Sequence, residues 1–539
     1  MKILAGAIGS DIHTAGILNF LYLAEREGYE TTYIGSVIGI DKLLDSVEEA
    51  SPDIVAVSYR LGKESCEQLL RELKLSLENR GIEKRLIFGG TVETAEIAER
   101  SGLFEKVFDG SEMPEEVVMF LRGTTDAKGQ VDYPQSLLER ITSKKPYPLI
   151  RHHIGLETVE ATEKAVRNLA ESGLLDIISL APDQNCQQWF FQQENMISSE
   201  DGAGGAPFRT REDFERIYEA SRTGNYPLMR CYSGTRDLLK FSLLFKETIN
   251  NAWAAVPLTW YSQLDGRSDR ELLEAIRDNQ GAIAWNGGKG IPVEINEAHQ
   301  WALRYCHAAV EVTTAYLAAL CAKRLGVEVY VAQYMFNTPP GISPRMDLAK
   351  ALAKKELIES LKDDNFTPVT MVRPGLMSLP ADPNLAMGQL VTSVYTAMNI
   401  DPEIVHVVAY CEATRRASDA EIIESVKMAK QAINEAIKGI PDFKQDKEIQ
   451  NHKEYLKSES ATIIEAMEKI RTGELTSPET IYTAIKLGIL DAPGLSKMSV
   501  AKGAVRTAII DGQSCAVDEE GTKIDENDRL TALTSENGD

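Results

Sequence analysis

The sequence predicts an α/β protein with a flavodoxin-like (Rossmann-like) domain, then a TIM (β/α)8 barrel and a small C-terminal unit. Three observations support this. The chain has 539 residues, more than one hydrophobic core usually organises. Short apolar segments alternate with helix-like segments over the first 120 residues and again from about Tyr147. Between these regions, GTTDAKGQVDY (123–133) is small and polar, as linkers are.

The N-terminal region is predicted to contain five strand–helix pairs. Strict alternation produces a parallel sheet covered on both faces. Five strands fit the flavodoxin-like order, whose ligands bind at the carboxyl ends of the strands. The predicted strands are Lys2–Ile8, Glu30–Ile34, Asp53–Ser58, Arg85–Phe88 and Lys106–Phe108, and the helices are Thr14–Gly28, Ile40–Ala50, Lys63–Asn79, Thr94–Ser101 and Pro114–Leu121.

The following region contains eight candidate strands, most of them followed by a helix-like segment, which suits a TIM barrel. They are Leu149–His152, Ile177–Leu180, Leu228–Cys231, Ala254–Pro257, Val293–Ile295, Val327–Gln333, Pro368–Val372 and Val405–Ala409. The predicted boundaries are therefore 1–122, a linker at 123–146, a barrel at 147–440 and an extension at 441–539. In the extension we expect a charged helix at Glu448–Glu468 and a loosely ordered acidic end, DENDRLTALTSENGD.

Composition excludes several classes of protein. The formal net charge of −23 argues against binding to nucleic acid or anionic membranes, which requires a basic face. No apolar run approaches the roughly 20 residues that span a bilayer. The apolar start lacks a signal-peptide cleavage pattern. The seven cysteines form no CxxC pair, which indicates reduced thiols in the cytoplasm rather than a zinc ribbon or iron–sulfur cluster.

The first predicted strand is followed by Gly9-Ser10-Asp11-Ile12-His13-Thr14-Ala15-Gly16, which matches the D-x-H-x-x-G signature of cobalamin-binding domains. A neutral imidazole is a good ligand for cobalt, so His13 is the candidate metal ligand. Asp11 can accept a hydrogen bond from the other ring nitrogen and fix the tautomer. Gly16 has no Cβ and allows a bulky group to approach. The alternative for the motif alone is a polar loop with a helix-capping aspartate.

Two further segments also favour a cobalamin site. The first is Ser58-Tyr59-Arg60-Leu61-Gly62, and the second is Phe88-Gly89-Gly90-Thr91. Each follows a predicted strand, so both lie at the edge where such sheets bind ligands. The family often has S-x-L in the first segment and a glycine pair in the second, and Arg60 here replaces the usual leucine. The predicted cofactor-binding residues are Ser10, Asp11, Ile12, His13, Thr14, Gly16, Ser58, Arg60, Leu61, Gly62, Gly89, Gly90 and Thr91.

Three classes of protein use this module. Methyl-transfer corrinoid proteins usually carry a helical domain before it, and only ten residues precede Asp11 here. Radical-SAM enzymes that use cobalamin need three clustered cysteines, which this sequence lacks. Adenosylcobalamin mutases pair the module with a TIM barrel, which is the predicted organisation. Corrinoid methyl transfer and a non-catalytic cobalamin carrier or sensor with a degenerate barrel stay open as alternatives.

The chain resembles adenosylcobalamin-dependent glutamate mutase (methylaspartate mutase), with the small and large subunits fused. The small subunit is similar through GSDIHTAG, VSYRLG, FGGT and FDGSEMPEEV. The large subunit is similar, weakly but in the same order, through PLIRH, NYPLMRCYSGTRDLL, VVAYCEATRRASDAEI, VKMAKQAI and LGILDAPGLSKMSVAKG. The resemblance implies adenosylcobalamin bound base-off with His13 on cobalt, a radical isomerisation, and a homodimer.

The resemblance also implies residues of the substrate site. The family holds a dicarboxylate with three arginines, of which Arg151 and Arg230 match two. Gln187 stands at the middle arginine, and no acid occurs where the family binds the substrate's amino group. Arg373 lies near a family histidine, and Glu412 matches the glutamate that holds the cofactor ribose. A site lacking two polar partners should reject the family's ligand, so we expect a small carboxylate or amino acid other than glutamate.

Overall fold

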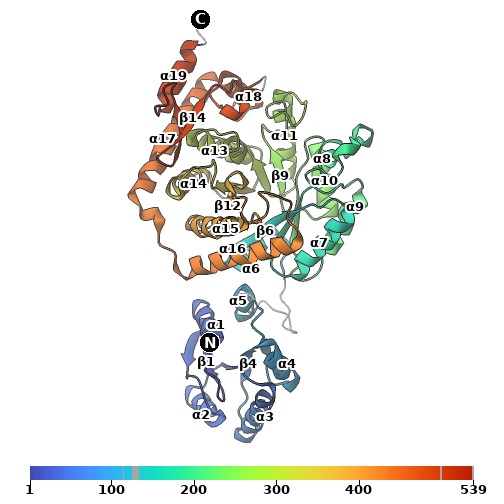
Figure 1. The fold of residues 1–539 in the computed structure, drawn as a ribbon, viewed down its shortest axis with the longest axis vertical. Coiled ribbons are helices and arrows are strands. Elements are labelled where there is room, and N and C mark those ends of the chain that lie inside the picture. The colour runs from blue at the N-terminus through green and yellow to red at the C-terminus, as the bar shows by residue number, and fades with distance from the viewer. Residues whose placement is uncertain (113, 124–132, 498–499, 537–539) are drawn as a thin grey trace. The chain divides into compact units, whose positions relative to one another are not determined.

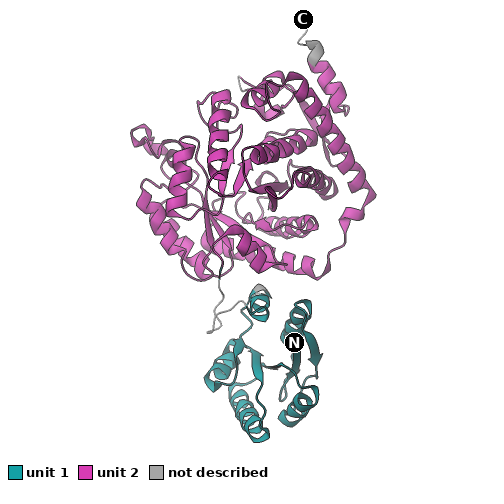
Figure 2. Ribbon diagram, turned by 180° about the vertical axis from the view of Figure 1, so that it is seen from behind, with its two compact units in different colours: residues 1–133 teal, residues 134–539 magenta. Residues whose placement is uncertain are grey.

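The structure is a computed structural model that describes residues 1–112, 114–123, 133–497 and 500–536. The chain divides into two compact units, Met1–Tyr133 and Pro134–Asp539 (Figure 2). Each unit is built around its own parallel sheet, as the alternating sequence pattern predicts.

Unit 1 is a five-stranded parallel sheet with the order β2-β1-β3-β4-β5, so the predicted flavodoxin-like topology is confirmed. The strands are β1 (Lys2–Ala7), β2 (Glu30–Tyr33), β3 (Ile54–Tyr59), β4 (Arg85–Gly90) and β5 (Lys106–Phe108). The helices are α1 (Ala15–Arg26), α2 (Ile40–Ala50), α3 (Lys63–Arg80), α4 (Val92–Ser101) and α5 (Pro114–Leu121).

The five helices cover both faces of this sheet (Figure 1). Helices α1 and α5 contact each other and share one apolar cluster, which includes Ile17, Leu21 and Phe120. Helices α2, α3 and α4 cover the other face around a second cluster. Every residue of β3 is buried, as expected for a central strand that is covered on both sides.

Unit 2 contains the predicted eight-stranded parallel barrel, in the order β8-β7-β6-β13-β12-β11-β10-β9. An isolated parallel bridge between Tyr232 and Ala255 brings the two edge strands together, so the barrel is nearly closed. The strands are β6 (Leu149–Ile154), β7 (Ile177–Leu180), β8 (Leu228–Cys231), β9 (Ala254–Pro257), β10 (Val293–Asn296), β11 (Val329–Phe336), β12 (Thr367–Pro374) and β13 (Ile404–His406).

Helices lie around this barrel (Figure 1). The α-helices up to the last strand and just beyond it are α6 (Leu137–Lys144), α7 (Val159–Glu171), α8 (Gln184–Trp189), α9 (Arg211–Ala220), α10 (Leu238–Thr248), α11 (Leu272–Gly287), α12 (Ala298–Ala302), α13 (Ala308–Arg324), α14 (Pro344–Glu359), α15 (Pro383–Ala397) and α16 (Asp419–Gly439). The short 3-10 helices are η1 (Gln193–Asn195), η2 (Ser198–Glu200), η3 (Leu376–Ser378), η4 (Met398–Ile400), η5 (Phe443–Gln445) and η6 (Pro493–Leu495).

The inward side chains of the barrel form layers. An apolar layer, including Leu149, Leu228 and Val369, closes the barrel near the starts of the strands. Alternate residues of a strand face the same side, so the next inward positions are two residues further on. At Arg151 and Arg230 these positions carry charge although both side chains are at most 1% exposed.

The C-terminal residues complete unit 2. They form α17 (Lys447–Ile470), which packs on α13 and α14, then α18 (Pro478–Leu487), the hairpin β14 (Arg506–Ile510) with β15 (Gln513–Val517), and α19 (Glu526–Glu536). The predicted charged helix is therefore confirmed. The expectation of a loosely ordered end is wrong for residues 526–536.

The acidic C-terminal end contributes two charged side chains to a buried cluster. Glu526 and Arg529 are buried, and Glu526 bonds to both Arg529 and His307. Arg529 also donates to the carbonyl oxygens of Gly488 and Ile489, 2.9 and 2.8 Å away. These partners satisfy the buried charges, which the sequence alone does not reveal.

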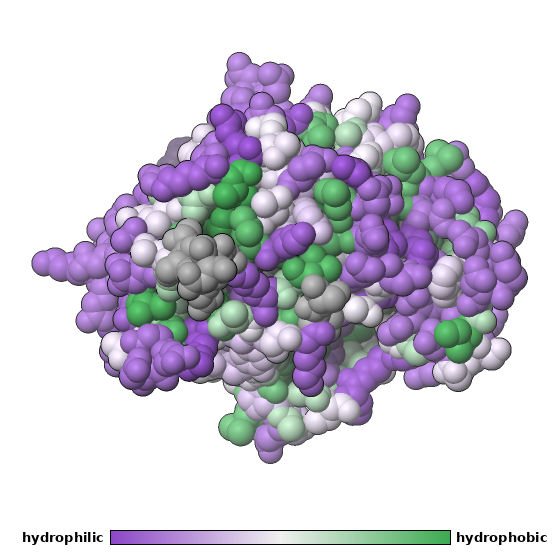
Figure 3. Space-filling view, turned by 90° about the horizontal axis from the view of Figure 1, so that it is seen from above, coloured by the Kyte–Doolittle hydropathy of each residue, from purple (hydrophilic) through white to green (hydrophobic). Residues whose placement is uncertain are grey.

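The predicted domain boundaries stay a prediction. The two units meet at residues 133 and 134, and the expected linker contains α6 as well as residues 124–132, which lie outside the described residues. None of the described helices is both long enough and apolar enough to cross a membrane. Hydrophilic residues predominate on the face in Figure 3, and hydrophobic ones are scattered in small groups, as the acidic composition suggests.

Candidate functional site

His13 lies in the loop between β1 and α1, and a buried aspartate fixes its imidazole. Asp11 is fully buried, and its Oδ1 lies 2.8 Å from both Nδ1 and the backbone nitrogen of His13. Its Oδ2 accepts a hydrogen bond of 2.6 Å from the backbone N–H of Arg60, which follows β3. Asp11 therefore joins the loops that follow two neighbouring strands.

This arrangement sets the tautomer of His13. A carboxylate accepts hydrogen bonds, so the proton of a neutral imidazole is held on Nδ1. The lone pair is then on Nε2, which has no hydrogen-bond partner among the residues described. The His13 side chain is 50% exposed, so this nitrogen is accessible. A neutral, oriented imidazole with a buried carboxylate behind it is the usual form of a metal-ligating histidine.

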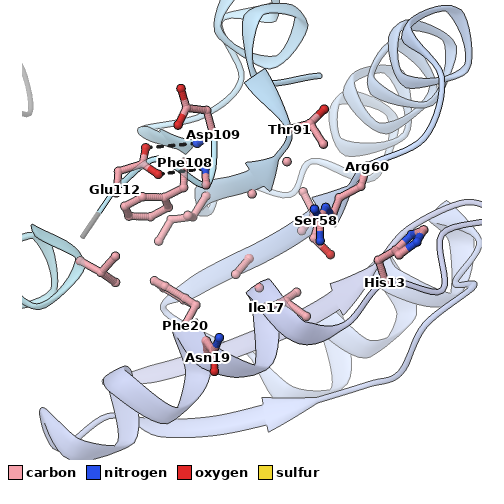
Figure 4. Close-up of a pocket in the computed structure, with 18 of the residues that line it drawn as sticks. His13, Ile17, Asn19, Phe20, Ser58, Arg60, Thr91, Phe108, Asp109 and Glu112 are labelled. Carbon is pink, nitrogen blue, oxygen red and sulfur yellow. Dashed lines mark hydrogen bonds between the residues drawn. The ribbon is translucent and has the colours of Figure 1, made fainter. Parts of the chain in front are cut away.

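A pocket of about 540 Å³ extends from His13 across the sheet between α1 and α5. Figure 4 shows His13, Ser58 and Arg60 toward one end and Phe20 and Phe108 toward the other. Glu112 holds the loop after β5, because its two carboxylate oxygens accept backbone N–H bonds of 3.1 Å from Asp109 and Gly110. The pocket is thus bounded by loops at the carboxyl ends of the strands and by apolar helix surfaces.

The pocket fits the nucleotide tail of a cobalamin. The hydroxyl of Ser58 is buried and makes no hydrogen bond within the described part of the chain, so it has a donor and an acceptor for a ligand. A Cβ added at Gly89 or Gly16 would meet no atom within 4 Å and would occupy space open to a ligand. Gly90 is different, because a Cβ there would lie 2.3 Å from Oγ1 of Thr94.

Of the other predicted cofactor residues, Arg60 and Thr91 line this pocket, and the remaining ones do not. Arg60 lines it, and the bond from its backbone to Asp11 does not depend on the side-chain type, so the unusual residue is tolerated. Thr91 caps α4 in a capping box with Thr94. The remaining predicted positions are Ser10 and Ile12, which are exposed, Thr14 at the N-cap of α1, Leu61, which is 38% exposed, and Gly62 at the N-cap of α3.

In unit 2, Arg151 is buried inside the barrel and has protein partners. Its Nε donates to Ser179 Oγ at 2.7 Å, and its Nη1 lies 3.1 Å from Nδ1 of His406. Burial, followed by the charge of Arg230, lowers the pKa of Arg151 to about 9. Arg151 is not among the residues that line the barrel's cavities.

Arg230 forms a fully buried ion pair with Glu294. Nη2 of Arg230 lies 2.8 Å from Oε2 of Glu294, which also accepts a 2.7 Å bond from the indole of Trp253. Nε and Nη1 of Arg230 are buried without a hydrogen-bond partner among the described residues. Leaving buried donors unpaired costs about 1–3 kcal/mol each, so this pair is only partly satisfied.

The three predicted arginines converge on Tyr232. The guanidinium carbon of Arg230 lies 4.4 Å from the centre of the Tyr232 ring. Burial alone raises the pKa of Tyr232, but the charges of Arg230, Arg151 and Arg373 outweigh it and lower the pKa below its ordinary value. Glu294, which pairs with Arg230, acts against these three charges on Tyr232.

Two histidines extend the network from Arg151 toward the ends of the strands. A guanidinium only donates hydrogen bonds, so Nδ1 of His406 must accept and its proton is on Nε2. That nitrogen lies 3.1 Å from Nδ1 of His153, which must accept in turn. Burial lowers the pKa of both histidines well below the ordinary value, so both are neutral at pH 7. Arg151 thus determines the tautomers of two residues.

Glu412 follows β13 and pairs with His152. Nε2 of His152 lies 2.9 Å from Oε1 of Glu412, which also accepts a 2.8 Å bond from the backbone of Ala409. Burial alone raises the pKa of Glu412, but the contact with His152 outweighs it and lowers the pKa to about 2. Glu412 is therefore ionised, and its predicted role toward the cofactor stays a prediction.

Two cavities open at the carboxyl ends of the barrel strands. The inner cavity, of about 200 Å³, is lined by Arg373, Gln333, Glu294, Tyr232 and other polar residues. The outer cavity, of about 780 Å³, is lined by Gln187 and Trp189 among others, and it shares Tyr261 and Arg267 with the inner one. Nε2 of Gln333 and Nε of Arg373 are buried and have no partner in the described ranges.

Sequence reasoning found the arginines but missed their neighbours. Glu294 and Gln333 lie on the inward faces of β10 and β11, where alternation with buried apolar residues is the only signal, and Tyr232 directly follows β8. The glycine-rich stretch 285–290 forms the end of α11 and a turn. In the aromatic stretch 189–191, Phe190 is buried, whereas Trp189 lines the outer cavity.

Comparison with known proteins adds independent information about both units. The methylaspartate mutase E chain family matches residues 289–522. The N-terminal part resembles glutamate mutase sigma subunit 1 of Haloarcula marismortui, with 27% identity over 129 residues that cover 22% of this chain and 83% of the relative. The C-terminal half of the chain is thus similar to the E chain of methylaspartate mutase, and the N-terminal part is similar to a sigma subunit of glutamate mutase.

Solved structures resemble the two units separately. One is a cobalamin-binding protein from Desulfitobacterium hafniense DCB-2, with 24% identity and a TM-score of 0.20 over 22% of this chain. The match spans 57% of that protein, less than two thirds of its length. Another is a truncated 3-deoxy-D-arabino-heptulosonate 7-phosphate synthase from Thermotoga maritima, with 12% identity and a TM-score of 0.30 over 55% of this chain and 87% of that one.

Proposed function

We propose that the chain is an adenosylcobalamin-dependent carbon-skeleton mutase that acts on a small carboxylate or amino acid other than glutamate. The similarity of residues 289–522 to the methylaspartate mutase E chain family supports an isomerase, and the similarity of the N-terminal part to a sigma subunit supports a cobalamin cofactor. The site in unit 1 adds residues that fit the cofactor, and the barrel adds a cationic interior.

The single observation that carries the cofactor assignment is the Asp11–His13 pair. A buried carboxylate 2.8 Å from Nδ1 leaves Nε2 unprotonated and exposed, which is what a cobalt ligand requires. His13 would hold the metal, Ser58 and Gly89 would contact the nucleotide tail, and Glu412 would receive the ribose of the adenosyl group. When bound, adenosylcobalamin supplies a carbon-centred radical by homolysis of its cobalt–carbon bond.

The protein's own contribution in the barrel is orientation and charge. Arg151, Arg230 and Arg373 produce a positive field around Tyr232, which Glu294 beside Arg230 partly offsets. Such a field favours an anionic substrate and holds it in a fixed orientation. Cavities lined by unpaired donors argue against a degenerate barrel, since nothing within the described protein uses those donors.

Corrinoid binding tests the first half of the proposal. Wild-type chain titrated with adenosylcobalamin should show the spectrum of the base-off, histidine-ligated form. His13→Ala should abolish that spectrum, and Asp11→Asn should weaken binding by roughly 10- to 100-fold, as loss of a partner behind a metal ligand usually does. Lys74→Ala, an exposed change on α3, is the matched control. Normal His-ligated spectra in His13→Ala would refute the assignment.

Isotope exchange tests the second half. The holoprotein is incubated with adenosylcobalamin tritiated at the 5′ carbon and a panel of small amino and carboxylic acids. A substrate should acquire tritium and should produce an electron paramagnetic resonance signal. A cobalamin carrier or sensor would give neither, and turnover of methyl groups with stable methylcobalamin would indicate corrinoid methyl transfer instead. The homodimer that the family implies is checked by light scattering.

A further inference from the structure

The inner cavity of the barrel contains two side chains that the protein leaves without partners. Arg373 makes no hydrogen bond or ion pair with any described residue, and its Nε is buried. Gln333 likewise makes no side-chain hydrogen bond in the described chain, and its Nε2 is buried. Buried polar groups in native proteins nearly always have a partner, so these two indicate a missing ligand.

Sheet geometry brings the two side chains to the same place. Strands β11 and β12 are parallel neighbours in which Gln333 pairs with Met371, whose sulfur contacts Arg151 inside the barrel. Arg373 is two residues beyond Met371, so it faces the same interior one layer further along. Both side chains line the inner cavity of about 200 Å³, which shares Tyr261 and Arg267 with the outer cavity.

The other two predicted arginines are already engaged. Arg151 donates to Ser179 and contacts His406, and Arg230 is paired with Glu294. Neither is among the residues that line the inner cavity. Their charges nevertheless lie close enough to lower the pKa of Tyr232, which does line it. Nε and Nη1 of Arg230 also have no partner among the described residues, but Arg230 does not line the inner cavity, whereas Arg373 and Gln333 do.

We propose that Arg373 and Gln333 form the carboxylate-binding pair of the barrel. Arg151 and Arg230 do not touch the substrate and act on it only through their positive charges. This inference rests on the proposed function and assigns its substrate anchor. The guanidinium of Arg373 provides charge and planar donors that match a carboxylate. The Gln333 amide provides a further donor. Arg151 is then a positioning residue, which fixes the tautomers of His406 and His153.

Binding of a simple probe separates this assignment from catalysis. The full chain, with and without hydroxocobalamin, is titrated calorimetrically with butanoate and with butanamide, which has the same shape without the charge. Butanoate should bind at least about tenfold more tightly, because a site built for a charged acceptor rejects the neutral analogue. Arg373→Gln and Gln333→Glu should each weaken butanoate binding by roughly tenfold or more, and Arg373→Lys should retain part of it.

Arg277→Gln is the matched control, because Arg277 is an exposed arginine on α11 whose ion pairs lie outside the cavities. Its butanoate affinity should equal that of the wild type. Far-UV circular dichroism identifies any variant that fails to fold. If Arg373→Gln does not fold, the butanoate affinity of Arg373→Lys is compared with that of the wild type instead. Equal binding of acid and amide, or wild-type affinity in folded Arg373→Gln and Gln333→Glu, would overturn the assignment.

The proposed function can fail separately. If His13→Ala keeps a normal corrinoid spectrum while butanoate binding still depends on Arg373 and Gln333, the mutase proposal fails and the carboxylate site stands. If the wild type binds corrinoid through His13 but binds butanoate and butanamide equally, the assignment of Arg373 and Gln333 fails and the cofactor site stands.

Discussion

The sites in the two units are built in opposite ways. The His13 site uses short loops that follow β1, β3 and β4, a carboxylate bound to two backbone N–H groups, and a pocket with an open edge. The barrel site uses charged side chains from strands far apart in sequence, such as Arg230 and Glu294, and buries them almost completely. The first depends on local conformation, and the second depends on mutual electrostatic compensation.

The largest expected effect comes from breaking that compensation. Arg230→Met should lower the free energy of unfolding by roughly 3–5 kcal/mol, because it leaves Glu294 as an unpaired buried charge. The double variant with Glu294→Gln should recover most of the loss. All five tryptophans lie in unit 2, so denaturant titrations followed by tryptophan fluorescence report on this unit alone.

The matched change in unit 1 removes a surface ion pair. Arg80→Ala breaks contacts with Asp41 and Asp45, both of which are exposed, and should leave stability nearly unchanged when unit 1 is followed by far-UV circular dichroism. If Arg230→Met proved as harmless as Arg80→Ala, the barrel interior would not depend on electrostatic compensation and the contrast would fail.

An intermediate effect is expected from Glu412 and should depend on pH. Its pKa is about 2 in the folded protein and ordinarily 4.5, so its contribution to stability is complete above pH 4.5 and is lost as the pH falls toward 2. At pH 7, Glu412→Gln should lower the free energy of unfolding by about 3 kcal/mol, because each unit by which the pKa is lowered corresponds to about 1.4 kcal/mol. The difference between wild type and variant should shrink on acidification. A difference that is constant from pH 7 to 3 would contradict the lowered pKa.

The smallest expected effect contrasts two neighbouring glycines of unit 1. Gly90→Ala forces a Cβ against Thr94 Oγ1 and the carbonyl of Tyr59, at 2.3 and 3.0 Å, and should cost about 1–3 kcal/mol of stability. Gly89→Ala meets no atom within 4 Å, so it should leave stability intact and weaken corrinoid binding. Unfolding followed by circular dichroism and a corrinoid titration distinguish the two, and equal stability losses would show that Gly89 serves packing instead.

The same contrast explains how much could be predicted from the sequence. All thirteen strands of the two parallel sheets were predicted, because apolar alternation and turn residues are local signals. The sequence also placed His13, Asp11 and the glycine pair at one edge of the sheet, where the structure has them, because each belongs to a short contiguous segment after a strand. The helical end at 526–536 was missed, because the burial of Glu526 and Arg529 depends on His307 and on backbone carbonyls distant in sequence.

The barrel site shows the same limit. Sequence reasoning found no acid where the family binds the substrate's amino group, yet Glu294 lines the inner cavity from another strand. It also named Arg151 and Arg230 as substrate anchors, whereas their hydrogen bonds go to protein atoms. Which arginine lines the inner cavity and which pairs with a carboxylate is decided by partners on other strands, and one sequence contains no signal for such pairings.

The sequence by itself determined the two folds, their order and the pairing of His13 with Asp11, because hydrophobic periodicity and a loop motif act over a few residues. Only the tertiary structure decided which charges neutralise one another inside the barrel and which remain available. Electrostatic interactions depend on distances and burial among residues brought together by closure of the sheet, and those distances exist only in the folded chain.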